Sequence, residues 1–169
     1  DRLKAGDKPP IEAAPTAALA EAFMALGEAM RGEERADLAL GYLRLAQHLD
    51  GDNELIAFAV AELLGQRERF VAAAEQFAAI DNDALLYDDA QIQRSQMLFE
   101  AGASEAAISV LNKQLKAQPD NRDLLISLGD LYRAEKRFAE AEKSYDGAIA
   151  SIEEASTRDW HLYFVRGMM

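Results

Sequence analysis

The sequence contains no cysteine, and its 169 residues include only four prolines and one tryptophan. The absence of cysteine excludes a disulfide framework and a thiolate nucleophile. It does not distinguish a reducing from an oxidising compartment. No apolar run approaches the about 18 residues that a membrane-spanning helix requires, so we expect no direct insertion into a membrane.

Positive charge is also scarce. Eighteen lysines and arginines stand against thirty aspartates and glutamates, which gives a net charge of −12. Binding to nucleic acid requires a basic face that neutralises phosphates, so we do not expect a nucleic-acid partner. An anionic membrane surface is excluded as a partner for the same electrostatic reason.

Motifs of catalysis are missing as well. The sequence has no HExxH, no glycine-rich phosphate loop and no GxSxG. His48 and His161 are far apart and neither has a motif partner. The acidic stretches Asp50–Asn53 and Asp81–Asp83 lack the ligand spacing of a calcium loop, and we interpret them as turn and cap residues. We therefore predict a non-enzymatic protein without a metal or a cofactor.

The composition that is present favours helix throughout. Half of the residues are apolar, alanine is abundant, and most prolines and glycines fall between periodic segments. The segment closest to a strand pattern, Leu55–Val60, continues into a helical pattern that ends at Gly65. The predicted fold class is therefore all-α.

A stretch near the C-terminal end, from Leu124 to Ala150, has the pattern of a helical hairpin with a polar break at Glu135–Arg137. The same pattern recurs at intervals of 34 residues. The residues that align with Gly129 are small: Gly27, Ala61 and Ser95. Those that align with Ala141 are all alanines: Ala39, Ala73 and Ala107. Those that align with Tyr145 are large and apolar: Leu43, Phe77 and Leu111. Because these columns agree independently, the sequence predicts a repeat array.

The small columns have a packing reason. Two antiparallel helices approach to about 8–10 Å only where the side chains at their crossing are small. We therefore expect the small residue of each first helix to contact the alanine of the second helix. A leucine at Ala107 should force the two helices apart.

The repeat predicts an array over residues 16–169, and residues 1–15 are interpreted as a linker or the end of a preceding repeat. The repeats span about 20–53, 54–87, 88–121 and 122–155, with a partial fifth from about Thr157. Their helices are expected at 16–32 with 35–49, 53–65 with 68–80, 86–101 with 104–117, and 121–135 with 138–152. Side chains that can cap a first turn are predicted at Asn53, Ser104 and Asn121.

The repeated pattern resembles the tetratricopeptide repeat family, most closely in the fourth copy. The resemblance implies a right-handed superhelical solenoid of antiparallel helix pairs. The third copy departs from the family at Gln91 and Arg94, so its first helix is either shifted or lies under a polar contact, and the fifth is offset at Trp160, Tyr163 and Gly167. The run GDLYRAEKRFAEAEKSYDGAIA, followed by WHLYFVRG, is similar to long repeat proteins of bacterial cell envelopes. That similarity implies a periplasmic or envelope location, and the cytoplasm is the alternative.

In this family the first helices line a concave groove through positions one, four, eight and eleven of a common register, which the resemblance carries onto four columns here. The first column is Glu21, Leu55, Asp89 and Asp123; the second is Met24, Phe58, Ile92 and Ile126; the third is Glu28, Glu62, Gln96 and Asp130; the last is Arg31, Gly65, Phe99 and Arg133. An apolar stripe with acidic borders predicts a protein or peptide segment with apolar anchors and Lys/Arg flanks. Some members of the family bind the C-terminal carboxylate of a peptide through basic residues in these columns. That binding mode is disfavoured here, because acids occupy the columns.

Several alternatives stay open at this level. The apolar column can pack within the array rather than bind a ligand, and the acids can serve only as a solvated face. Trp160, Tyr163 and Phe164 have the pattern of a packing face, so the open ends of the array could form homo-oligomers. The chain could also be a regulatory segment of a protein with a catalytic domain elsewhere.

Overall fold

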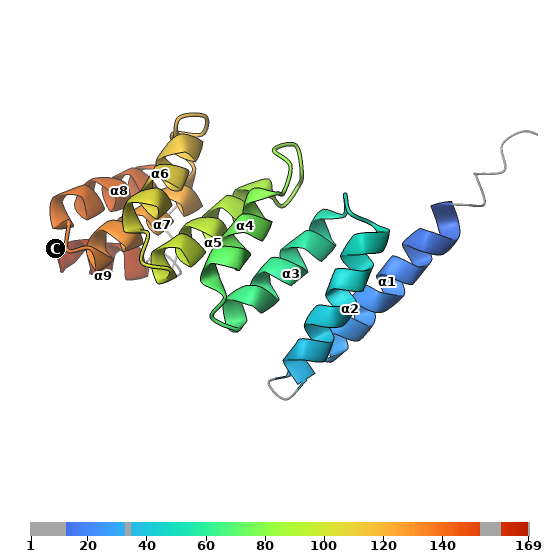
Figure 1. Ribbon diagram of the computed structural model, residues 1–169. Helices are drawn as coiled ribbons and strands as arrows, with labels where there is room; N and C mark the ends of the chain where they lie inside the picture. Colours follow the sequence, from blue (N-terminus) through green and yellow to red (C-terminus); the bar gives the residue numbers. More distant parts are fainter. Residues whose placement is uncertain (1–12, 33–34, 153–159, 169) are drawn as a thin grey trace, which may run out of the picture.

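The computed structural model describes residues 13–32, 35–152 and 160–168, and these residues form helices without any strand. The helices are α1 Ala13–Ala29, α2 Ala36–Leu49, α3 Glu54–Gln66, α4 Phe70–Ala78, α5 Tyr87–Glu100, α6 Ser104–Leu115, α7 Arg122–Ala134, α8 Phe138–Ala150 and α9 Trp160–Gly167. Each helix packs against the next in the chain, which produces an elongated array from α1 to α9 (Figure 1). The predicted all-α architecture of helix pairs is confirmed.

Two of the three predicted N-caps are confirmed. The Asn53 side chain accepts hydrogen bonds from the N–H groups of Leu55 and Ile56 at 3.2 and 3.4 Å. Asn121 accepts from the N–H of Leu124 at 3.2 Å. These bonds satisfy N–H groups that the first turn of a helix leaves without a partner.

The third predicted cap, Ser104, is wrong. Ser104 is already the first residue of α6, and Ala103 occupies the cap position without a side-chain hydrogen bond. The Ser104 hydroxyl instead donates to Glu135 Oε1 at 2.6 Å, at the end of α7. The Ser104 hydroxyl therefore joins two neighbouring repeats instead of capping its own helix, as the local pattern had predicted.

The first helix begins earlier than predicted, at Ala13 rather than residue 16, and ends at Ala29. Pro15 lies in its first turn, where a backbone N–H would have no partner within the helix in any case. Residues 1–12 of the predicted linker 1–15 and the predicted start of the fifth repeat near Thr157 lie outside the described residues, while residues 13–15 belong to α1.

The alanine of each second helix is buried as expected, while Gly27 and Gly129 lie against the large residue of the second helix rather than against the alanine side chain. Ala39, Ala73, Ala107 and Ala141 are each 0% exposed. A Cβ built on Gly27 would lie 2.7 Å from Leu43 Cγ, and one built on Gly129 would lie 2.7 Å from Tyr145 Cε1. Both distances are far shorter than a van der Waals contact, so close packing requires glycine at these two crossings.

Larger side chains fill the space between successive hairpins. Leu43 of α2 shares a buried cluster with Val60, Leu63 and Leu64 of α3. Leu111 of α6 does the same with the leucines of α7, which are Leu124, Leu128 and Leu131. Because each hairpin completes the core of its neighbour, contacts between adjacent repeats stabilise the stack in addition to those within each hairpin.

The polar residues of the third repeat lie under a polar contact, and α5 is not shifted. Ser95 remains buried at the small-residue position. Gln91 is also buried and accepts a hydrogen bond from Arg94 at 3.3 Å. Nearby, buried Gln114 donates to the Tyr87 hydroxyl at 3.1 Å. Hydrogen bonds thus replace the apolar contacts of the other repeats without a change of register.

Candidate functional site

The first predicted groove column is the most accessible. Its acids Glu21, Asp89 and Asp123 are exposed, and Leu55, at the same register on α3, is 54% exposed. An exposed leucine within a column of carboxylates presents an apolar contact and negative charge to the same partner. This column therefore has the properties expected of a binding surface.

The apolar column is only half exposed, because each of its members also packs inside the array. Met24 contacts the clusters around Ala39 and Ala46. Phe58 meets Phe77 edge to face, with ring centroids 5.1 Å apart. The other two members pack against the cores that follow them in the chain: Ile92 and Ile126. Substitution in this column would thus disturb packing as well as any ligand contact.

Two acids of the third column are paired across a repeat boundary by Arg31. Its Nε lies 2.9 Å from Glu28 Oε2, and its Nη1 lies 3.0 Å from Glu62 Oε2. Its Nη2 also donates to the carbonyl oxygen of Ala59 at 3.2 Å. The arginine therefore links the end of α1 to α3 and lowers the negative potential of this part of the groove.

The remaining members of the third column are also engaged with neighbours. Gln96 donates to Glu100 at 2.7 Å. Asp130 Oδ1 accepts from the Tyr145 hydroxyl at 2.7 Å and from Arg133 Nη2 at 3.5 Å. The last column is divided: Phe99 packs against the core between α6 and α7, while Arg133 is exposed. The free negative charge is therefore concentrated in the first column.

The contact between Tyr145 and Asp130 makes stability depend on pH in alkaline solution. Burial of the ring and then the hydrogen bond to Asp130 raise the pKa of Tyr145 from 10.0 to about 12, against the lowering effect of Arg133. An unfolded tyrosine releases its proton near its ordinary pKa, whereas folded Tyr145 retains it. We therefore expect stability to fall as the pH rises from about 10 to about 12.

The comparison that checks this is between the wild type and Tyr145→Phe, which has no titrating group at this position. The difference between their urea midpoints should shrink as the pH rises through this interval. A difference that stays constant would show that the Tyr145 phenol is not the group responsible.

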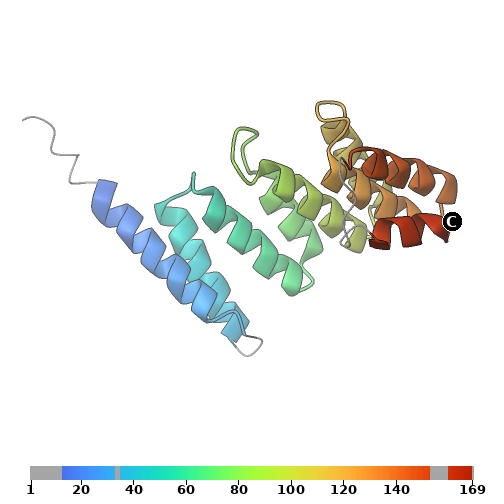
Figure 2. The same cartoon turned by 180° about the vertical axis from the view of Figure 1, so that it is seen from behind.

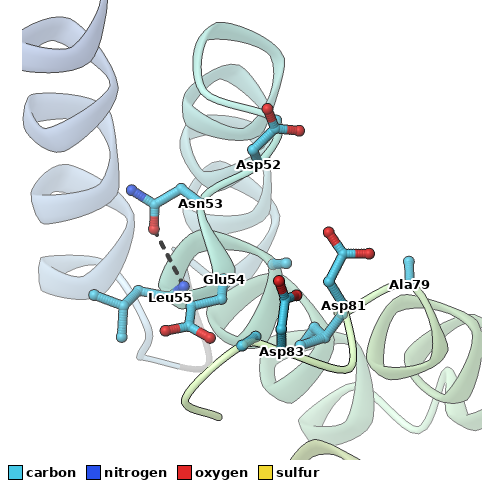
Figure 3. Close-up of a pocket in the computed structure, with 11 residues that line it drawn as sticks. Asp52, Asn53, Glu54, Leu55, Ala79, Asp81 and Asp83 are labelled. Carbon is cyan, nitrogen blue, oxygen red and sulfur yellow. Dashed lines mark hydrogen bonds between the residues drawn. The ribbon is translucent and has the colours of Figure 1, made fainter. Parts of the chain in front are cut away.

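A cavity of about 640 Å³ opens between the turn before α3 and the loop that follows α4. Figure 3 shows Asp52, Asp81 and Asp83 on its rim, with Leu55 on the opposite side of Glu54. Glu54 Oε2 accepts a hydrogen bond from the N–H of Leu86 at 3.2 Å, which ties the loop to α3. The cavity is therefore acidic, with exposed Leu55 at its edge.

Sequence reasoning assigned the two acidic stretches of this cavity to separate turns. The repeat itself is the signal that could have joined them, because each turn lies beside the turn one repeat later. Among the residues that the structure describes, no group of three or more His, Cys, Asp or Glu could hold a metal ion. The arrangement is suited to a cationic group joined to an apolar side chain.

Comparison with known proteins agrees with the fold. Residues 98–156 match the family model described as tetratricopeptide repeat. No curated protein matches the chain. In the described part of the chain, no helix is both long and apolar enough to cross a membrane.

Three solved structures are similar to this chain at low sequence identity. PilF of Pseudomonas aeruginosa is 18% identical, with 91% of this chain and 69% of PilF covered at a TM-score of 0.67. PilW, a widely conserved type IV pilus biogenesis factor, is 17% identical, with 94% and 72% covered at 0.69. YrrB, a TPR protein with an unusual peptide-binding site, is 13% identical, with 76% and 66% covered at 0.55. The tetratricopeptide resemblance and the right-handed solenoid of helix pairs are confirmed.

Proposed function

We propose that this tetratricopeptide chain is a non-enzymatic interaction scaffold that holds a peptide or protein segment on its odd-numbered helices, in the bacterial cell envelope. The general role is indicated by the fold, which is that of protein-interaction modules. The envelope is supported by PilW, a type IV pilus biogenesis factor of the same fold. Binding of a peptide is supported by YrrB, which has a peptide-binding site.

One observation carries the proposal for the binding surface. The exposed first column places Leu55 among carboxylates, at the edge of the acidic cavity between α3 and the loop after α4. A segment with an apolar anchor and Lys or Arg on either side would contact Leu55 while its cations face Asp81, Asp83 and Asp89. The exposed acids would raise the association rate and fix the register of the partner more than they add affinity. A shallow surface of this kind supports micromolar binding, about −8 kcal/mol.

The test is a pull-down with the purified chain as bait and separate envelope and cytoplasmic extracts as prey. The double variant Leu55→Asp, Asp89→Lys should lose the partners that the wild type retains, with affinity reduced about tenfold or more. Changes at Phe58 or Ile92 are less suitable because both side chains pack in the core.

A matched control is Glu75→Lys, an exposed charge reversal on the even-numbered helix α4. It should leave retention unchanged. For the retained partner, association should slow as salt increases, because exposed charges are screened. If the double variant keeps its helical content and still retains the same partners, the proposed binding surface is wrong. If partners are found only in the cytoplasmic extract, the proposed envelope location is wrong.

Self-assembly through α9 is a second candidate that one observation favours. In α9, Leu162 is buried against the cluster of Ala141 and Tyr145, while Trp160 and Phe164 are exposed with ring centroids 5.8 Å apart. The exposed aromatic pair of α9 is a surface on which another helix can pack. Concentration-dependent size exclusion of a Trp160→Ser, Phe164→Ser variant against the wild type distinguishes this candidate from groove binding.

A further inference from the structure

The outer face of α2 carries an apolar surface that the fold does not require. Leu38 is 59% exposed and Leu45 is 49% exposed, with half-buried Tyr42 between them. Together with Asp37 and Gly41 these residues line a hollow of about 380 Å³. Leu19 and Leu26 of α1 are also exposed, and the Phe23 ring stacks on Tyr42 at 6.0 Å: the apolar surface thus extends over the first hairpin.

The other second helices do not carry this surface. In the later repeats, the positions of Leu38, Gly41 and Leu45 hold polar or small residues. They are Ala72, Glu75 and Ala79 one repeat later, Ala106, Ser109 and Lys113 two repeats later, and Glu140, Lys143 and Gly147 three repeats later. The other repeats therefore fold without leucine at these positions, and the leucines of α2 are specific to the first hairpin.

Gly41 is a second and independent departure. It lies in the middle of α2, where glycine destabilises a helix relative to alanine. A Cβ built on Gly41 would meet nothing within 4 Å, unlike those on Gly27 and Gly129, which would collide with neighbouring side chains. No contact among the described residues requires this glycine. It is explained if the backbone of another helix approaches α2 closely from outside.

The arrangement of the surface is symmetric. Leu38 and Leu45 lie at equal distances from the midpoint between Gly41 and Tyr42. When two copies of α2 cross antiparallel at that midpoint, Leu38 of each copy meets Leu45 of the other, and the glycines lie at the crossing. This self-complementarity is the property of a two-fold interface between identical chains.

Charge favours the same pairing. Since successive residues of a helix are turned by about 100°, Asp37, Arg44 and His48 lie on one flank of α2. The antiparallel crossing places Asp37 beside Arg44 and His48 of the second copy. Within its own chain Arg44 donates to the neutral oxygens of Gln47 and Gln76, at 2.7 and 3.0 Å. A carboxylate from the second copy would give this arginine a charged partner.

The face is also basic within an acidic protein. Arg67 lies 2.8 Å from Asp37, and burial, followed by the charge of nearby Arg69, lowers the pKa of Arg44. The net charge of −12 opposes association of copies in general. Repulsion is weakest where these arginines gather, so two copies would meet most readily through α2.

We propose that two copies of this chain form an antiparallel dimer through the outer face of α2, centred on Gly41. The dimer leaves the acidic first column of the groove available and does not depend on what binds there. It would join two arrays at their first hairpins, which lie at the end of the stack opposite α9 (Figure 2).

Because the chain lacks cysteine, introduced cysteines test this geometry directly. A mixture of Leu38→Cys and Leu45→Cys chains should form disulfide-linked heterodimers under mild oxidation. Leu38→Cys alone should not, since the two positions would lie about 10 Å apart along the helix axis. The matched control is a mixture of Ala106→Cys and Lys113→Cys chains, which carry cysteines at the same register on α6 and should not become cross-linked.

A second variant measures association without a cross-link. Gly41→Gln puts a side chain into open space, so the folded monomer should be at least as stable as the wild type. It should nevertheless weaken dimerisation about tenfold or more in sedimentation equilibrium. A wild type that is monomeric at high micromolar concentration would overturn the proposal, as would cross-linking that is equal in the α6 control, or cross-linking of Leu38→Cys to itself. Dimerisation that Gly41→Gln does not change would overturn it too.

Discussion

Replacement of Tyr145 by alanine is expected to lower the free energy of unfolding by about 3–5 kcal/mol, as for other large aromatic residues in cores. The ring is 1% exposed and lies against Gly129, between α7 and α8. It also belongs to the cluster that holds Leu162 of α9. Alanine would leave a cavity on both sides of α8, so the end of the array should lose order together with the fourth repeat.

Tyr145→Phe is the matched control, because it keeps the ring and removes only the hydroxyl. The bond to the Asp130 carboxylate is 2.7 Å long, and its loss should cost about 1.5–3 kcal/mol. Urea unfolding followed by circular dichroism gives both values. If the alanine and phenylalanine variants are equally stable, the ring does not support the packing of α8 as described.

The positions at which each hairpin needs a small or buried residue could be predicted from the sequence. Ala73 and Ala107 are buried, as the alanine column requires, and Gly129 lies against a ring that would collide with a Cβ. These contacts depend on residue size at a crossing between two helices that are consecutive in the chain. A repeated size pattern therefore contains the necessary information.

Contacts between repeats could not be predicted in the same way. Arg31 was placed in a groove column, but its pairing with Glu62 depends on how closely one hairpin approaches the next. The hydroxyl of Ser104 was assigned to capping, but it donates to Glu135 of the following repeat. Side chains of this length reach several partners, and only the relative position of the repeats decides among them.

The groove shows the same limit. The period identified which residues share a face, but it could not show that Met24 and Phe58 also pack in the core. Nor did it predict the acidic cavity, which forms where Asp52 and Asp81 approach each other from separate turns. Exposed Leu55 carries more of the proposed site than the half-buried apolar column does.

The second large effect is expected for Ala107→Leu. Ala107 is fully buried at the crossing of α5 and α6, in the cluster that includes Ile108 and Leu111. A leucine would add three carbons where the helices touch, and it could be accommodated only if the helices separate. Overpacking of this kind costs about 1–3 kcal/mol, and more where the backbone cannot move.

The substitution Ala106→Leu, one residue earlier, is the control, because it introduces a leucine without crowding the helix crossing. Ala106 is exposed on the same helix, and its counterpart in the first repeat is already leucine, at Leu38. Urea unfolding of Ala106→Leu and Ala107→Leu is therefore the most direct measurement of whether helix pairs close through small residues. We expect Ala106→Leu to stay within about 0.5 kcal/mol of the wild type while Ala107→Leu loses at least about 1 kcal/mol. Equal stability of the two variants would contradict the account.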